Sequence, residues 1–155
     1  MVFLIFSHEL YLVALAMLGI YVSATDFLYR KIQNHTLLIL LFLQCFLSPL
    51  DIQIMSFLLV LGGGLIVYAL IWIGAGDIKY AAVLSLTIPL SDLLWAFVMT
   101  AFTGGFLAVI YLVYNKLISK RLVRKTTNGQ QGIPYGIAIS VGFYLVILTQ
   151  NTPHI

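Results

Sequence analysis

Six apolar stretches separated by short polar breaks organise this chain of 155 residues. The stretches lie near 8–25, 35–50, 53–73, 79–90, 92–115 and 133–150, and the breaks fall at Arg30-Lys31, Asp51, Gly74 to Asp77, Pro89 to Asp92 and Lys116 to Gln131. A membrane-spanning helix needs about 20 predominantly apolar residues, so we expect tilted or incomplete spans at the short second and fourth stretches. The apolar runs are continuous, whereas a barrel strand alternates apolar and polar residues. The pattern predicts an all-α, polytopic membrane protein with about six transmembrane helices.

The composition agrees with an integral membrane protein. Hydrophobic residues make up 62% of the chain and charged residues 8%, and the mean hydropathy is +1.08. Soluble domains carry about 25% charged residues. Apolar stretches recur almost to the C-terminus, so we expect one membrane-embedded domain over 1–155, with lipid as a partner and no nucleic acid. The single cysteine, Cys45, excludes a disulfide framework, and we expect it to be buried as a small hydrophobe.

The basic residues orient the six expected spans. Cytoplasmic loops of membrane proteins carry an excess of lysine and arginine. Here every basic residue falls in the first, third or fifth loop: Arg30, Lys31, Lys79, Lys116, Lys120, Arg121, Arg124 and Lys125. This predicts a multi-pass protein of the cytoplasmic membrane with both termini outside. Asp26 and Asp77 then both lie at the cytoplasmic face.

Asp26 and Asp77 are the candidate reaction centre. We expect Asp26 to end the first span and Asp77 to open the fourth, at the same membrane depth. Carboxylates at a membrane boundary are costly and often functional. Two carboxylates held close together share one proton, which equips them for acid and base roles at once. One would take a proton from water while the other donates to a scissile carbonyl oxygen, as in aspartic proteases.

Several neighbouring residues have both a functional and an ordinary interpretation. Gly74 and Gly76 would leave room for a substrate strand beside Asp77, or would simply form an interhelical turn. Lys79 and Arg30 would tune the pKa of a carboxylate or pair with lipid headgroups. Asn34 serves a site or caps the second helix. Gly62 to Gly64, Gly104-Gly105 and the pair Gly136/Ser140 predict close helix packing.

Three other interpretations compete with a protease. A metal site would have only His35 beside the two aspartates, which is a thin ligand set, so we expect no metal and no organic cofactor. A small proton- or cation-coupled transporter subunit would use the same aspartates, although such carboxylates often lie near mid-membrane. A structural assembly subunit would tolerate Asp→Asn changes.

Three segments together resemble the prepilin peptidases, a family of membrane aspartic proteases. They are Asp26-Phe27-Leu28-Tyr29-Arg30-Lys31-Ile32-Gln33-Asn34, Gly74-Ala75-Gly76-Asp77-Ile78-Lys79 and Ile133-Pro134-Tyr135-Gly136. The resemblance implies that Asp26 and Asp77 are the catalytic pair and that Pro134, Tyr135 and Gly136 lie near them. It implies an aspartic endopeptidase that removes the leader of prepilin-like precursors, which carry a hydrophobic N-terminal segment, at the cytoplasmic face.

The departures from the family pattern indicate which type of prepilin peptidase the chain resembles. Where the family often has Ile-Pro-Asn, this chain has Ile32-Gln33-Asn34, so the turn before the second span would differ. The paired CxxC motifs of larger, methylating members are absent from the sequence given. The chain is similar to the compact, peptidase-only type of tight-adherence (Flp) pilus assembly systems, and archaeal preflagellin peptidases are similar too. Methylation of the product would need another protein, and pilus assembly machinery is an expected partner.

Overall fold

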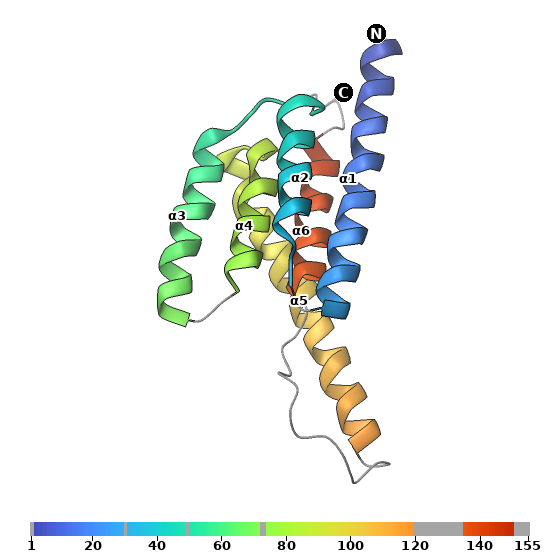
Figure 1. The fold of residues 1–155 in the computed structure, drawn as a ribbon, viewed down its shortest axis with the longest axis vertical. Helices are drawn as coiled ribbons and strands as arrows, with labels where there is room; N and C mark the ends of the chain where they lie inside the picture. Colours follow the sequence, from blue (N-terminus) through green and yellow to red (C-terminus); the bar gives the residue numbers. More distant parts are fainter. Residues whose placement is uncertain (1, 30, 49, 72–73, 120–134, 151–155) are drawn as a thin grey trace.

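The computed structural model is a bundle of helices (Figure 1). It describes residues 2–29, 31–48, 50–71, 74–119 and 135–150, and no strand occurs within them. The elements are α1 (Val2–Tyr29), α2 (Asn34–Phe46), α3 (Ile54–Ile71), α4 (Ala75–Leu84), the 3₁₀ turn η1 (Ser85–Thr87), α5 (Leu90–Ser119) and α6 (Tyr135–Gln150). The six apolar stretches therefore correspond to six α-helices, and the all-α prediction is confirmed.

Our expectations for the starts of three helices, α4, α5 and α2, were wrong. Asp77 lies in the first turn of α4, not in a break, because the helix begins at Ala75 and the Gly74 carbonyl already accepts its first hydrogen bonds. The break before α5 consists of Ile88 and Pro89, and the Pro89 carbonyl accepts the N–H of Asp92 and starts the helix. Asn34 is the first residue of α2 and the N-cap is Gln33, without a side-chain cap bond, so the capping interpretation of Asn34 fails.

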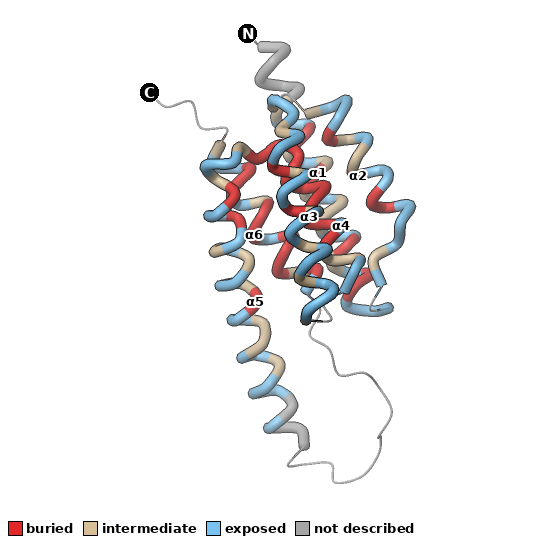
Figure 2. Tube along the Cα trace, turned by 90° about the vertical axis from the view of Figure 1, so that its left-hand side faces the viewer, coloured by how far each residue is buried: buried red, intermediate tan, exposed pale blue. Residues whose placement is uncertain are grey.

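α6 lies at the centre of the packing. It packs on α5 and α1 and also contacts α4, while α3 and α2 cover the remaining sides of α4. The most buried large side chains come from these helices, among them Tyr11, Leu40, Tyr80, Phe143 and Ile147. Figure 2 shows this buried core running along the middle of the bundle, whereas the lower part of α5 extends beyond it with mostly exposed or half-buried residues.

Close approach between helices occurs at some of the predicted glycines and also at Gly142, which the predicted glycine motifs did not include. A Cβ built on Gly142 would lie 2.6 Å from the backbone nitrogen of Thr100, so α6 and α5 approach closely there. One built on Gly64 would collide with the Ile78 side chain. Gly62, Gly63 and Gly105 instead face open space. The glycine motifs therefore predicted close packing correctly at only some of their positions.

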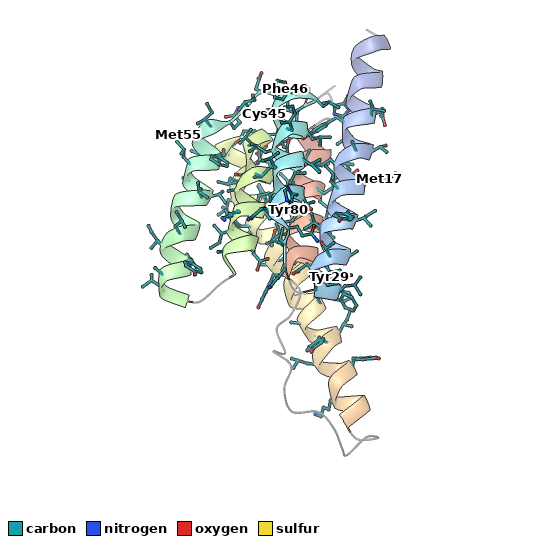
Figure 3. All side chains as sticks on the ribbon, viewed as in Figure 1. Met17, Tyr29, Cys45, Phe46, Met55 and Tyr80 are labelled. Carbon is teal, nitrogen blue, oxygen red and sulfur yellow. The ribbon has the colours of Figure 1, made fainter. Side chains whose placement is uncertain are left out.

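The outer faces of the helices are strongly apolar. Large hydrophobic side chains are exposed on α1, α2, α3 and α5, for example Met17 and Met55, which point outward in Figure 3. Soluble proteins seldom expose so much apolar surface. Among the described residues, two helical segments are long and apolar enough to cross a membrane by themselves: His8–Tyr29 and Leu90–Tyr114. Cys45 is exposed, contrary to the expectation that it is buried, because it lies on the outer face of α2.

Candidate active site

Asp26 lies near the end of α1 and is almost fully buried, with 7% of its surface exposed. Its Oδ2 accepts a hydrogen bond of 2.8 Å from the backbone N–H of Gly136, in the first turn of α6. A Cβ built on Gly136 would lie 2.7 Å from Oδ2, 3.0 Å from Cγ and 3.1 Å from the Cβ of Asp26. Contacts this short show that residue 136 must be glycine for Asp26 to sit where it does.

Asp77 lies in the first turn of α4 and is half-buried. The Gly74 carbonyl accepts the N–H of Asp77 at 3.1 Å and that of Ile78 at 3.4 Å, which fixes the start of the helix. A Cβ on Gly74 would lie 3.0 Å from Asp77 Oδ2, whereas one on Gly76 would make only ordinary contacts with Ile32, at 3.5 Å and beyond. Gly74, more than Gly76, is therefore the glycine whose missing side chain leaves space for the Asp77 carboxylate.

The two aspartates influence each other electrically. Asp77 lies in the first turn of α4, outside the two membrane-length helices. Burial, and to a lesser extent the negative charge of the nearby Asp26, together raise the pKa of Asp77 from 3.8 to about 6. Two negative charges close together are energetically costly, so the second carboxyl group of a pair is expected to have a raised pKa.

The remaining candidates have mixed outcomes. Lys79 and Asn34 are both exposed, and Tyr135 opens α6 with its ring half exposed. Arg30 and Pro134 lie outside the described residues. Of the motif around residue 135, only Gly136 has a described contact with an aspartate.

Sequence reasoning missed a group of hydroxyls next to this site. Ser140 Oγ donates to the Gly136 carbonyl at 2.7 Å and lies 2.7 Å from the Tyr80 hydroxyl and 3.0 Å from Ser23 Oγ. Tyr80 is 1% exposed, and Figure 3 shows it in the middle of the bundle. The only sequence signal is the helical spacing: Ser23 precedes Asp26 by three residues and Tyr80 follows Asp77 by three, so each shares a helix face with its aspartate.

A groove adjoins the hydroxyl group. It has a volume of about 410 Å³ and lies between α1, α4 and α6. Its walls are mainly apolar, and the lining residues that carry hydroxyl groups are Ser23, Tyr80, Ser140 and Tyr144. The site therefore combines a carboxylate pair at one end of the bundle with an apolar groove leading away from it.

The donor set is poorly suited to a metal ion. Within the described part of the chain, no group of three or more histidine, cysteine, aspartate or glutamate side chains gathers that could hold one. Two carboxylates with one backbone N–H nearby are better suited to moving protons between water and a bound carbonyl group.

The comparison with protein families finds one match. The model of the type IV leader peptidase family matches residues 13–109, which is more than half of the chain and includes both Asp26 and Asp77. Comparison with curated proteins and with solved structures gives no match.

Proposed function

Since this chain belongs to the type IV leader peptidase family, we propose that it is a membrane aspartic endopeptidase with Asp26 and Asp77 as its acid/base pair. The family is one of membrane proteases, so peptidase activity and prepilin-like substrates follow from membership. The observation that carries the assignment of residues is the junction of α1, α4 and α6, where Asp26 is buried against Gly136 and where burial, followed by the charge of Asp26, raises the pKa of Asp77.

The two aspartates divide the chemistry between them. The N–H of Gly136 can only donate, so Oδ2 of Asp26 accepts this bond and carries no proton itself. In the proposed mechanism Asp26 is the general base. Asp77, whose pKa is raised, holds the proton that the pair shares. Asp26 takes a proton from a water molecule, which attacks the scissile carbonyl carbon while Asp77 protonates the carbonyl oxygen. The tetrahedral intermediate collapses when the leaving amine receives a proton, and the pair returns to its starting state.

The setting of the reaction completes the proposal. The six helices cross or enter the cytoplasmic membrane with both termini outside, and the aspartate end faces the cytoplasm. Figure 1 shows the end of α1, the start of α4 and the end of α5 toward the same end of the bundle. Lys31 follows α1, Lys79 lies in the first half of α4 and Lys116 lies in the last turn of α5, and these basic residues support the proposed orientation. α4 has only 10 residues, about 15 Å of helix, so it enters the membrane without crossing it alone.

The proposed substrate is the precursor of a pilin-like protein with a basic leader followed by a hydrophobic segment. Cleavage just before that segment at the cytoplasmic face would release the leader. Exposed cationic side chains such as Lys79 do not attract a basic leader, so its recognition falls to the carboxylates and backbone of the site. The compact, Flp-type assignment and any partner in pilus assembly belong to this same proposal.

Co-expression with such a precursor tests the proposal. The intact protein should shorten the precursor, and mass spectrometry should place the new N-terminus immediately before the hydrophobic segment. A chelator in the membrane assay should leave cleavage unchanged, because the chemistry proposed here uses carboxylates and water alone. No cleavage of any of several precursors with this architecture would count against the peptidase assignment, and chelator inhibition would count against the metal-free mechanism. The transporter alternative has no support from the family match.

A further inference from the structure

Three hydroxyl residues link the helices that carry the candidate site. Ser23 is on α1 with Asp26, Tyr80 is on α4 with Asp77, and Ser140 is on α6 with Gly136. Each lies about one helical turn from its neighbour in the site, on the side toward the middle of the bundle. The three helices are therefore joined by side-chain hydrogen bonds at one level, immediately inside the level of the two aspartates.

We propose that Ser23, Tyr80 and Ser140 form a positioning cluster that sets the relative depth and rotation of Asp26, Asp77 and Gly136. This inference rests on the proposed function. None of the three residues is assigned a contact with substrate, so they act through the helices they join.

Ser140 is the hub of the cluster. Its hydroxyl has one proton, which it donates to the Gly136 carbonyl, and its lone pairs remain for Tyr80 and Ser23. The same Gly136 holds Asp26 through its N–H. A shift of Ser140 would therefore displace the residue that fixes Asp26, and Tyr80 would carry the shift to α4.

Hydrogen bonds are well suited to this role in an apolar bundle. Aliphatic contacts between helices change little when one helix slides or turns slightly, because one apolar surface replaces another. A buried hydroxyl that loses its partner, by contrast, finds no substitute in lipid or in the apolar walls of the groove. The cluster thus favours one register of α1, α4 and α6 over its neighbours.

The close approach of α1 and α6 brings the hydroxyls within reach of each other. A Cβ on Gly19 would lie 3.8 Å from the Ser140 Cβ and 3.9 Å from the Tyr80 hydroxyl. The Ser23 hydroxyl lies 2.7 Å from the Gly19 carbonyl oxygen and 3.0 Å from Ser140 Oγ, and its single proton bonds to one of these two acceptors at a time. Gly136 and Ser140, four residues apart, therefore both face α1, and the small side chains serve the hydrogen bonds as well as the packing.

Steady-state kinetics on single variants tests the cluster. Tyr80→Phe and Ser140→Ala each remove one hydroxyl and keep most of the packing. The substrate for this test is a prepilin-like precursor that the intact protein cleaves. Both variants should lose about 10- to 100-fold in kcat, because a small misplacement of reacting groups costs that much, with KM within about twofold. The double variant should lose no more than the worse single variant.

Ser85→Ala is the matched control. Ser85 is fully buried and follows directly after α4, but its hydroxyl bonds only to the Ala82 carbonyl in the same stretch of chain. The Ser85→Ala variant should keep kcat within about twofold of that of the intact protein, although this change also removes a buried hydroxyl. Unchanged kcat in both cluster variants, or an equal loss in Ser85→Ala, would overturn the proposal.

A second measurement separates the cluster from the proposed function. Infrared titration of the carboxyl groups needs no substrate, and Asp77→Asn identifies the Asp77 band. In Tyr80→Phe the Asp77 pKa should move down from about 6 without reaching its ordinary value, because the charge of Asp26 is displaced while burial, the larger cause of the raised pKa, remains. An unchanged Asp77 pKa in Tyr80→Phe would overturn the proposed cluster even if cleavage is observed. If the Asp77 pKa moves in Tyr80→Phe but the intact protein cleaves no precursor, the positioning cluster is supported and the peptidase assignment is contradicted.

Discussion

The backbone N–H of Gly136 donates a 2.8 Å hydrogen bond to Oδ2 of Asp26, joining residues 110 positions apart in the chain. Glycine is the residue that allows this contact, because any Cβ would fall against the carboxyl group. The bond places the third motif of the sequence directly against the first.

Gly136→Ala should therefore inactivate the enzyme. The added methyl group would meet Oδ2 at 2.7 Å and Cγ at 3.0 Å, so Asp26 would have to move. We expect a loss of about 100-fold or more in kcat/KM, measured by precursor cleavage in membranes. Gly105→Ala is the control, since Gly105 also lies in a helix but faces open space. Equal activity of the two variants would contradict the described geometry.

Gly142→Ala should act on stability instead of chemistry. Its Cβ would meet the backbone nitrogen and Cα of Thr100 at 2.6 and 2.7 Å, and backbone atoms cannot move aside as a side chain can. Overpacking of this kind costs about 1–3 kcal/mol, which should appear as a lower free energy of unfolding in detergent micelles. Gly62→Ala, where nothing lies within 4 Å, should be neutral or slightly stabilising. A neutral Gly142→Ala would show that α5 and α6 are not in this close contact.

Asp77 should make stability depend on pH in a defined direction. Its pKa is raised from 3.8 to about 6 by burial and then by Asp26, so between these values the folded state binds more protons than the unfolded state. The free energy of unfolding should therefore fall as the pH rises from about 4 to about 6, and level off above that. Thermal unfolding in detergent across this range measures it. Asp77→Asn, which is neutral throughout, should lack this fall; an identical pH profile in that variant would contradict the assignment.

The sequence predicted the helices well and their ends less well. Continuous apolar runs indicated six helices, but the glycines around Asp77 suggested a break where the chain already forms the first turn of α4. Lys116 suggested the end of the fifth stretch, yet α5 continues to Ser119, because that part extends beyond the bundle where a charge costs little. Local residue types indicate breaks, whereas the end of a helix also depends on its surroundings.

The candidate aspartates were visible in the sequence because carboxylates are rare in apolar runs. The hydroxyl cluster was not, since serine and tyrosine are common in membrane helices and the bond between Ser23 and Ser140 spans 117 residues. Only the three-dimensional packing of α1, α4 and α6 brings these groups together. Ser140 had been recognised as a small packing residue, and its hydrogen bonds became apparent only with its neighbours in place.

The most direct test of the central claim compares Asp26→Asn, Asp77→Asn and the double variant in one cleavage assay, with membrane insertion checked for each. Residues that act as one acid/base unit lose activity together, so each single change should abolish cleavage as completely as both changes do. The new N-terminus of the precursor should appear only with the intact protein. Cleavage that persists in either single variant at a level near that of the intact protein would contradict the shared-proton mechanism.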